Sequence, residues 1–150
     1  MYNKVLVPLD KSKEAEKVLP LIKSQLDPDG EIILLHIIPF FKSLKAGDHV
    51  VPGHQREEAE RVRAMDYLRS VAKGLSGDQV RCRCEVFVSD SVAEGIMQVA
   101  TQWGVDAVAM YTHDRKGLAK LIKGSIAEKV RRTALIQVKV FKPQQLLKPA

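Results

Sequence analysis

The chain has 150 residues and a mass of 16.7 kDa, and 45% of its residues are hydrophobic and 28% charged. This length fits a single domain, and folding at this size hides roughly 70% of the surface that the unfolded chain exposes. The composition excludes disordered, collagen-like and low-complexity chains. The longest apolar stretch is too short to span a membrane and the N-terminus lacks a signal-peptide pattern, so we expect a cytoplasmic protein without a membrane span.

The net charge is +6, from 24 basic and 18 acidic residues. A basic domain can meet nucleic acid, anionic lipid or a phosphorylated ligand. Aromatic residues make up only 5% of the chain, which argues against a nucleic-acid partner held by base stacking. The segment 115–132 carries seven basic residues and one acidic residue, so the positive charge is focused there.

Strand and helix patterns alternate five times, beginning with the buried-strand pattern of Tyr2–Leu9. Ser12 can cap a helix that runs to about Gln25. Asp27–Gly30 is a turn signal, and the almost continuously apolar Glu31–Ile38 is typical of a strand covered on both faces.

The second half of the pattern follows an irregular segment, Pro39–Gly53. Apolar residues at helical spacing then predict a long helix over Gln55–Leu75, and Val80–Val88 alternates like a strand near a sheet edge. A capping box at Ser91 opens a helix that Gly104 ends. Two further strands with a loop and helix between them complete the chain: Asp106–Tyr111, Gly117–Arg132 and Leu135–Phe141.

This alternation indicates a single α/β domain, with a doubly wound parallel sheet and helices on both faces. Ligands of such sheets bind beyond the carboxyl ends of the strands, where the winding reverses. We therefore expect a site among four segments that follow or end strands: Pro8–Ser12, His36–Pro39, Ser89–Ser91 and Tyr111–Ser125.

Two cysteines, Cys82 and Cys84, lie two residues apart in the third strand pattern. Their side chains point the same way at about 6.5 Å along the strand, which is a poor spacing for a disulfide. We expect two small packing residues.

Asp10, at the tip of the first strand, is the first candidate site residue. A carboxylate there can accept hydrogen bonds from the ring or sugar of a ligand, or it can help to cap the first helix, and the two roles are compatible. Gly124–Ser125 suits a phosphate, although an ordinary helix start explains the pair as well. The sequence contains no metal-ligand spacing, nucleophile elbow or triad, so we expect no catalytic residues and no bound metal centre.

Four segments together resemble the universal stress protein family: Lys4–Ser12 (KVLVPLDKS), Leu34–Ile38 (LLHII), Ala107–His113 (AVAMYTH) and Gly124–Val130 (GSIAEKV). The resemblance implies one domain over residues 1–141 with a tail over 142–150. It implies a five-stranded parallel sheet in the order 3-2-1-4-5, of the adenine nucleotide alpha-hydrolase-like type. It also implies a homodimer through the last strand (Leu135–Phe141) and a cytoplasmic role in stress tolerance, with an unknown protein partner.

The resemblance further implies an adenine-nucleotide site, with ATP and Mg²⁺ as its ligands. The residues that would form it here are Pro8, Leu9, Asp10, Ile37, Tyr111, His113, Asp114, Arg115, Gly124, Ser125 and Ile126.

Several residues depart from the family pattern. Tyr111 and Asp114 stand where the family has two loop glycines, and Lys11 replaces the glycine of its Asp-Gly-Ser. Glycine permits positive φ and lets backbone N–H groups approach a phosphate. Asp114 also repels each phosphate charge by roughly 1 to 3 kcal/mol, which Arg115, Lys116 or Mg²⁺ can offset.

We therefore expect a non-enzymatic stress-response regulatory or binding module with a degenerate nucleotide loop that does not retain ATP. The alternative is an ATP- or AMP-binding member of the family that acts as a nucleotide-dependent switch with slow ATP hydrolysis.

Overall fold

The computed structural model describes residues 1–76, 80–111 and 136–141. Five strands of these residues form one sheet: β1 (Tyr2–Pro8), β2 (Leu26–Ile38), β5 (Arg81–Val88), β6 (Ala107–Tyr111) and β7 (Gln137–Phe141). Their order across the sheet is β5-β2-β1-β6-β7, and all neighbouring pairs are parallel. The predicted α/β class and the predicted 3-2-1-4-5 order are both confirmed.

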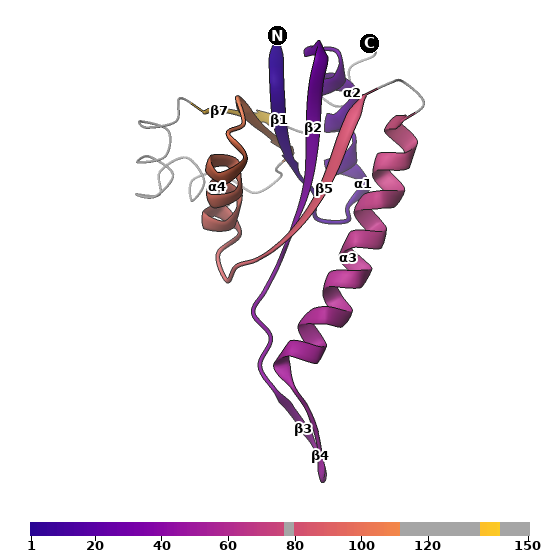
Figure 1. Ribbon diagram of the computed structural model, residues 1–150, viewed down its shortest axis with the longest axis vertical. Coiled ribbons are helices and arrows are strands. Elements are labelled where there is room, and N and C mark those ends of the chain that lie inside the picture. Colours follow the sequence, from indigo (N-terminus) through magenta and orange to yellow (C-terminus); the bar gives the residue numbers. More distant parts are fainter. Residues whose placement is uncertain (77–79, 112–135, 142–150) are drawn as a thin grey trace.

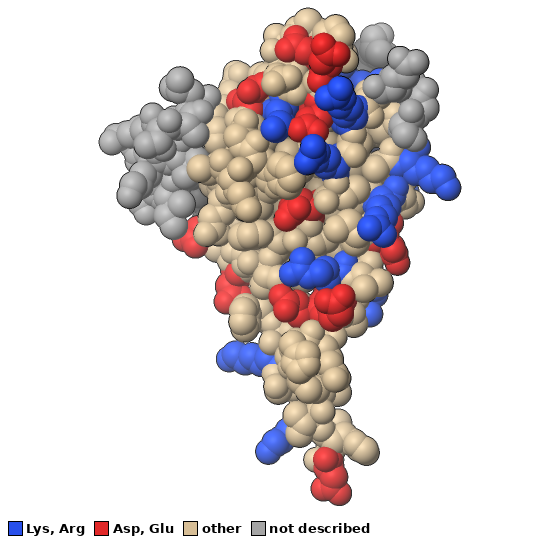
Figure 2. Space-filling model, in the orientation of Figure 1, with Lys and Arg blue, Asp and Glu red and all other residues tan. Residues whose placement is uncertain are grey.

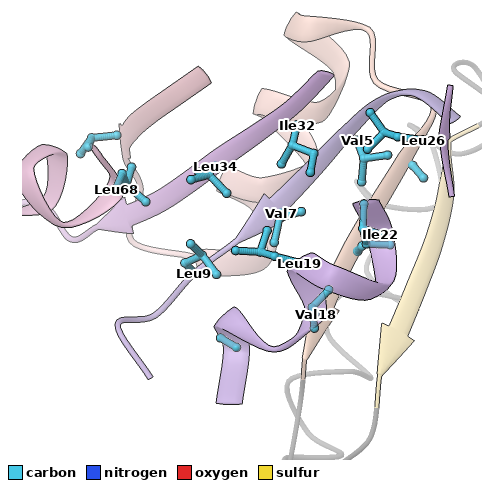
Figure 3. Close-up of a cluster of buried hydrophobic side chains, with 14 of the residues drawn as sticks. Val5, Val7, Leu9, Val18, Leu19, Ile22, Leu26, Ile32, Leu34 and Leu68 are labelled. Carbon is cyan, nitrogen blue, oxygen red and sulfur yellow. The ribbon is translucent and has the colours of Figure 1, made fainter. Parts of the chain in front are cut away.

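Helices cover both faces of the sheet (Figure 1). The helices α1 (Lys13–Glu16), α2 (Val18–Lys23) and α3 (Gly53–Ser76) pack on one face, and α4 (Val92–Trp103) packs on the other. Each face therefore has its own hydrophobic core, as expected for parallel strands that are buried on both sides. The core under α1–α3 contains Val7 and Leu34 (Figure 3), while Leu6 and Ile33 lie in the core under α4.

The single helix predicted over 12–25 is instead two short helices that meet at Lys17. Pro20 explains the break, because it has no N–H to donate to the carbonyl of Glu16 and its ring crowds that carbonyl. The apolar face is kept, since Val18, Leu19 and Ile22 are buried as the pattern required.

The turn predicted over Asp27–Gly30 lies inside β2. Tyr2 of β1 pairs with Leu26, but Lys4 pairs with Glu31. An advance of two residues along β1 thus corresponds to an advance of five residues along β2. The turn-forming residues Asp27–Gly30 lie in this irregular part of the ladder. A bulge of this kind lets a strand continue past residues that would otherwise end it.

The segment 39–53, predicted as irregular, contains an antiparallel hairpin of β3 (Leu44–Ala46) and β4 (His49–Val51). Gly47, with φ +63°, supplies the positive φ that a two-residue hairpin turn requires. The hairpin projects beyond the end of β2 (Figure 1).

The two outer strands of the described sheet are β5 and β7. The edge position of β5 is as predicted, and Cys82 and Cys84 pack as free cysteines against the core under α3. This confirms their interpretation as packing residues.

On β7, the polar side chains of Gln137 and Lys139 bind residues of the same chain. The Tyr2 hydroxyl donates to Gln137 Oε1 at 2.9 Å, and Lys139 Nζ donates to Gln25 Oε1 at 2.6 Å. Lys139 also lies over the Tyr2 ring, 5.1 Å from its centroid. Leu135 lies outside the described residues, and the homodimer through this strand stays a prediction.

Charges of both signs are intermixed over the face of the molecule that Figure 2 shows. This agrees with the sequence, because residues outside 115–132 carry no net formal charge. The charge focus predicted at 115–132 falls outside the described residues. Among the described helices, none has the length and apolar character needed to cross a membrane.

Candidate ligand-binding site

A pocket of about 170 Å³ lies beyond the carboxyl ends of β1, β2 and β6. This is the place where the winding of the sheet reverses, because β2 and β6 flank β1 on opposite sides. The residues that line it come from these strands, the first loop, α1 and α4: Pro8, Leu9, Asp10, Ala15, Leu35, His36, Ile37, Val92, Ile96, Met110 and Tyr111.

The loop after β1 is held by a chain of short hydrogen bonds. Asp10 Oδ1 accepts from the backbone N–H of Ser12 at 2.9 Å, and Ser12 Oγ accepts from the N–H of Ala15 at 3.2 Å. Ser12 is therefore the N-cap of α1, as predicted, and Asp10 supports the cap indirectly. A carboxylate has about four lone-pair sites, so this structural role is compatible with a bond from Asp10 to a ligand.

Lys11, between these two residues, has φ +71°. The position therefore keeps the left-handed backbone for which glycine is favoured, although the side chain is a lysine. That side chain turns to α3, where Nζ lies 3.4 Å from Glu60 Oε1. The hydrogen bond from Arg63 and the charge of Lys11 together hold the pKa of Glu60 below its usual value.

His36, at the end of β2, fixes the far side of the same loop. Its Nδ1 lies 2.7 Å from the carbonyl oxygen of Leu9, and because that oxygen only accepts, Nδ1 carries a proton. The His36 ring packs edge-on against Tyr67 of α3, with centroids 6.4 Å apart. The Tyr67 hydroxyl donates to Glu16 Oε2 at 3.1 Å. Burial raises the pKa of Tyr67, and the Glu16 carboxylate adds to this rise.

The backbone of Ile37 faces the open end of the sheet. Leu9 N–H donates to the carbonyl of Leu35 at 2.8 Å, and Ser89 N–H donates to the carbonyl of Ile38 at 3.0 Å. Backbone groups of successive strand residues alternate between the two neighbours. The N–H and C=O of Ile37 therefore point to the β1 side, where β1 has already ended.

The remaining walls of the pocket are apolar. Ile96 of α4 is fully buried, while Val92 at the start of the same helix is 58% exposed. Ser91 Oγ accepts from the N–H of Glu94 at 3.3 Å, so the predicted cap at the start of α4 is present. Gly104 ends the helix with φ +62°, as predicted.

Five of the predicted site residues line this one pocket: Pro8, Leu9, Asp10, Ile37 and Tyr111. The other predicted site residues lie outside the described part of the chain: His113, Asp114, Arg115, Gly124, Ser125 and Ile126. Among residues 1–76, 80–111 and 136–141, no group of three or more His, Cys, Asp and Glu side chains is placed to hold a metal ion.

Tyr67 is a supporting residue that the sequence did not predict, whereas His36 lies in the segment His36–Pro39 where a site was expected, although it was not among the predicted nucleotide-binding residues. The position of His36 at the end of the second strand is the signal that selected this segment, since ligands bind at strand ends. Tyr67 has no such signal, because it reaches the loop from the middle of α3.

Comparison with known proteins gives consistent results over nearly the whole chain. The model of the universal stress protein family matches residues 1–142. The universal stress protein Sll1388 of Synechocystis is 26% identical over 142 residues, covering 86% of this chain and 90% of that protein. The universal stress protein MJ0577 of Methanocaldococcus jannaschii is 26% identical over 149 residues, with coverage of 87% and 88%.

Solved structures agree with the sequence relatives. The structure of MJ0577 matches with a TM-score of 0.65 at 25% identity and covers 95% of this chain and 96% of its own. A universal stress protein from Arabidopsis thaliana, solved with AMP bound, has a TM-score of 0.55 at 17% identity, with coverage of 93% and 91%. The five-stranded parallel sheet is common to these folds, and with the family match over residues 1–142 it shows that this chain belongs to the universal stress protein family.

Proposed function

We propose that this chain binds an adenine nucleotide in the pocket beyond β1, β2 and β6. The bound nucleotide acts as a regulatory signal, and the module itself catalyses no reaction. The observation that carries the proposal is the convergence of three features on one pocket. They are the carboxylate of Asp10, the outward-facing backbone pair of Ile37, and apolar walls.

The size and lining of the pocket favour a flat ring. At about 170 Å³ it is smaller than complete small-molecule sites, which are usually about 300–1,000 Å³. A base would fill it and leave the sugar and phosphates outside. Val92 and Met110 line the pocket and offer apolar surface to a base.

The polar groups suit adenine in particular. Adenine presents an amino donor beside ring-nitrogen acceptors, and the C=O and N–H of Ile37 offer the complementary acceptor and donor. Asp10, at the mouth of the first loop, suits the hydroxyl groups of a ribose. Relatives with the same fold that were solved with AMP, dAMP and cAMP support the choice of an adenine nucleotide.

Calorimetric titration of the nucleotide-stripped protein with AMP, ADP and ATP, with and without Mg²⁺, tests the proposal. Asp10→Ala and Val92→Trp, which covers the pocket mouth, should each weaken binding by at least about tenfold, or about 1.4 kcal/mol. Asp66→Ala is the matched control, because Asp66 is an exposed carboxylate of α3 outside the pocket lining. A saturating nucleotide should also stabilise the wild type by about 2.7 kcal/mol at 100 times Kd.

Two results would contradict the proposal. No binding at millimolar nucleotide would mean that Tyr111 closes the site, leaving a module that works through its protein surface. Release of inorganic phosphate from ATP, abolished by Asp10→Ala, would instead favour the switch with slow hydrolysis.

A further inference from the structure

A second opening lies between α3 and the edge strand β5, and it shares no lining residue with the nucleotide pocket. It is a groove of about 600 Å³. Three sulfur side chains line it, Met65 from α3 and Cys82 and Cys84 from β5, together with the cations Arg69 and Lys73. The three sulfur side chains pack against the core and also line this groove beside two positive charges.

The two thiols are placed as a pair. They are free, partly buried residues on the same face of β5, about 6.5 Å apart along the strand. Burial raises the pKa of Cys82 to about 12, and the neighbouring Cys84 is a second, smaller cause of this rise. Because β5 is an edge strand, the groove opens to solvent and an ion can enter.

We propose that this groove binds one monovalent soft metal ion of the Cu(I) class, held by the thiolates of Cys82 and Cys84 with the thioether of Met65 beside them. Thiolates and thioethers select soft metals, Cu(I) among them. A structural zinc ion takes four ligands, and the described residues offer no group of three or more His, Cys, Asp and Glu side chains. Cu(I) is stable with two or three sulfur ligands.

The charges of the groove suit this ion. Binding replaces both thiol protons with one Cu⁺, so two protons leave and the bis-thiolate complex carries one negative charge. Arg69 and Lys73 line the same groove and balance that charge. The charge of Arg69 already acts on Cys84, where it opposes the rise in pKa that burial causes.

Proton release gives the site a measurable signature. Both cysteine ligands must lose a proton when they bind the metal as thiolates. The apparent association constant should therefore rise about 100-fold per pH unit between pH 6.5 and 8. One thiolate would give about tenfold, and a site without thiolates would give no change.

The test is an anaerobic competition of the reduced full-length chain against the Cu(I)–bicinchoninate complex, followed by its absorbance, with stoichiometry from native mass spectrometry. We expect one Cu(I) per chain, the 100-fold pH dependence, and at least about 100-fold weaker binding in Cys82→Ser and Cys84→Ser. Met65→Leu should weaken binding several-fold, because it keeps the shape of the side chain and removes the sulfur.

The matched control is the double variant Cys84→Ser/Glu85→Cys, which keeps two thiols but places them on opposite faces of β5. It should bind no better than Cys84→Ser. Equal affinity of this control and the wild type would overturn the proposal. So would one Cu(I) shared between two chains, tighter binding of Zn²⁺ than of Cu(I), or failure to compete with bicinchoninate. The pH dependence is measured on the wild type, so it decides the question even if a cysteine variant does not fold.

Discussion

The close packing of α4 against the end of β2 makes Gly95→Ala a sharp test of the structure. A Cβ atom at Gly95 would lie 2.9 Å from Ser89 Cβ and 3.0 Å from Ile37 Cδ1. Ser89 cannot easily retreat, because its N–H donates to the carbonyl of Ile38 at 3.0 Å and its Oγ donates to the carbonyl of Ser91 at 2.8 Å. Overpacking of this kind costs about 1–3 kcal/mol.

The helix preference works in the opposite direction. Replacing glycine by alanine inside a helix gains about 1 kcal/mol, so the net loss for Gly95→Ala is about 1 kcal/mol. Gly74→Ala is the matched control, because nothing lies within 4 Å of a Cβ at Gly74 in α3. This control should gain about 0.5–1 kcal/mol.

Chemical denaturation of both variants and the wild type measures the free energy of unfolding. The two variants should differ by about 2 kcal/mol, with the Gly95 variant the weaker. In thermal unfolding, each kcal/mol corresponds to about 2–4 °C for a chain of this size. AMP affinity should also fall in Gly95→Ala, since the added methyl group pushes on Ile37. Equal stabilisation by both substitutions would refute the reasoning.

Two further predictions concern hydrogen bonds between residues far apart in the chain. Asp106 Oδ2 accepts from the backbone N–H groups of Asn3 at 2.6 Å and Lys4 at 3.0 Å. Asp106→Ala should cost about 0.5–1.5 kcal/mol of unfolding free energy, because water can replace the lost acceptor at this exposed position. It should also accelerate hydrogen exchange at these two amides, and unchanged exchange would contradict the prediction. The pKa of Tyr67 is raised by burial and then by Glu16. The folded chain therefore keeps a phenolic proton that the unfolded chain loses above about pH 10, and stability falls as pH rises through that value. Tyr67→Phe should lose less stability than the wild type between pH 9.5 and 11 in urea titrations, and parallel curves would rule out this role for Tyr67.

Much of the fold follows from the hydrophobic pattern. The apolar run Glu31–Ile38 and the alternation over Val80–Val88 predicted a doubly covered strand and an edge strand, because side-chain period reports burial directly. The turn predicted at Asp27–Gly30 does not separate a helix from a strand, because these residues lie inside β2. The hydrogen-bonded ladder between β1 and β2 outweighs their local preference for a turn. The Tyr2 N–H donates to the carbonyl of Gln25 at 2.8 Å, so pairing begins before the turn residues.

The sequence predicted those site residues that are defined by their place at the end of a strand. It did not predict those that join the site through contacts between distant parts of the chain. Asp10 follows β1 and Ile37 lies at the end of β2, and the rule that ligands bind at strand ends was enough to select them. The approach of Tyr67 to His36 joins residues far apart in the chain, and no local pattern reports such a contact. Lys11 shows a third case, since the sequence suggested a lost glycine while the backbone keeps the left-handed conformation.

Chemical-shift mapping of the ¹⁵N-labelled protein during an AMP titration tests the nucleotide proposal most directly. The base should perturb the amide of Ile37 most strongly, together with those of Asp10 and Tyr111, while Gly74 on α3 should stay unchanged. The shift of Ile37 should saturate with the Kd found by calorimetry and should vanish in Val92→Trp. Saturating AMP that leaves Ile37 unperturbed, or that perturbs only residues away from the ends of β1, β2 and β6, would contradict the proposed site.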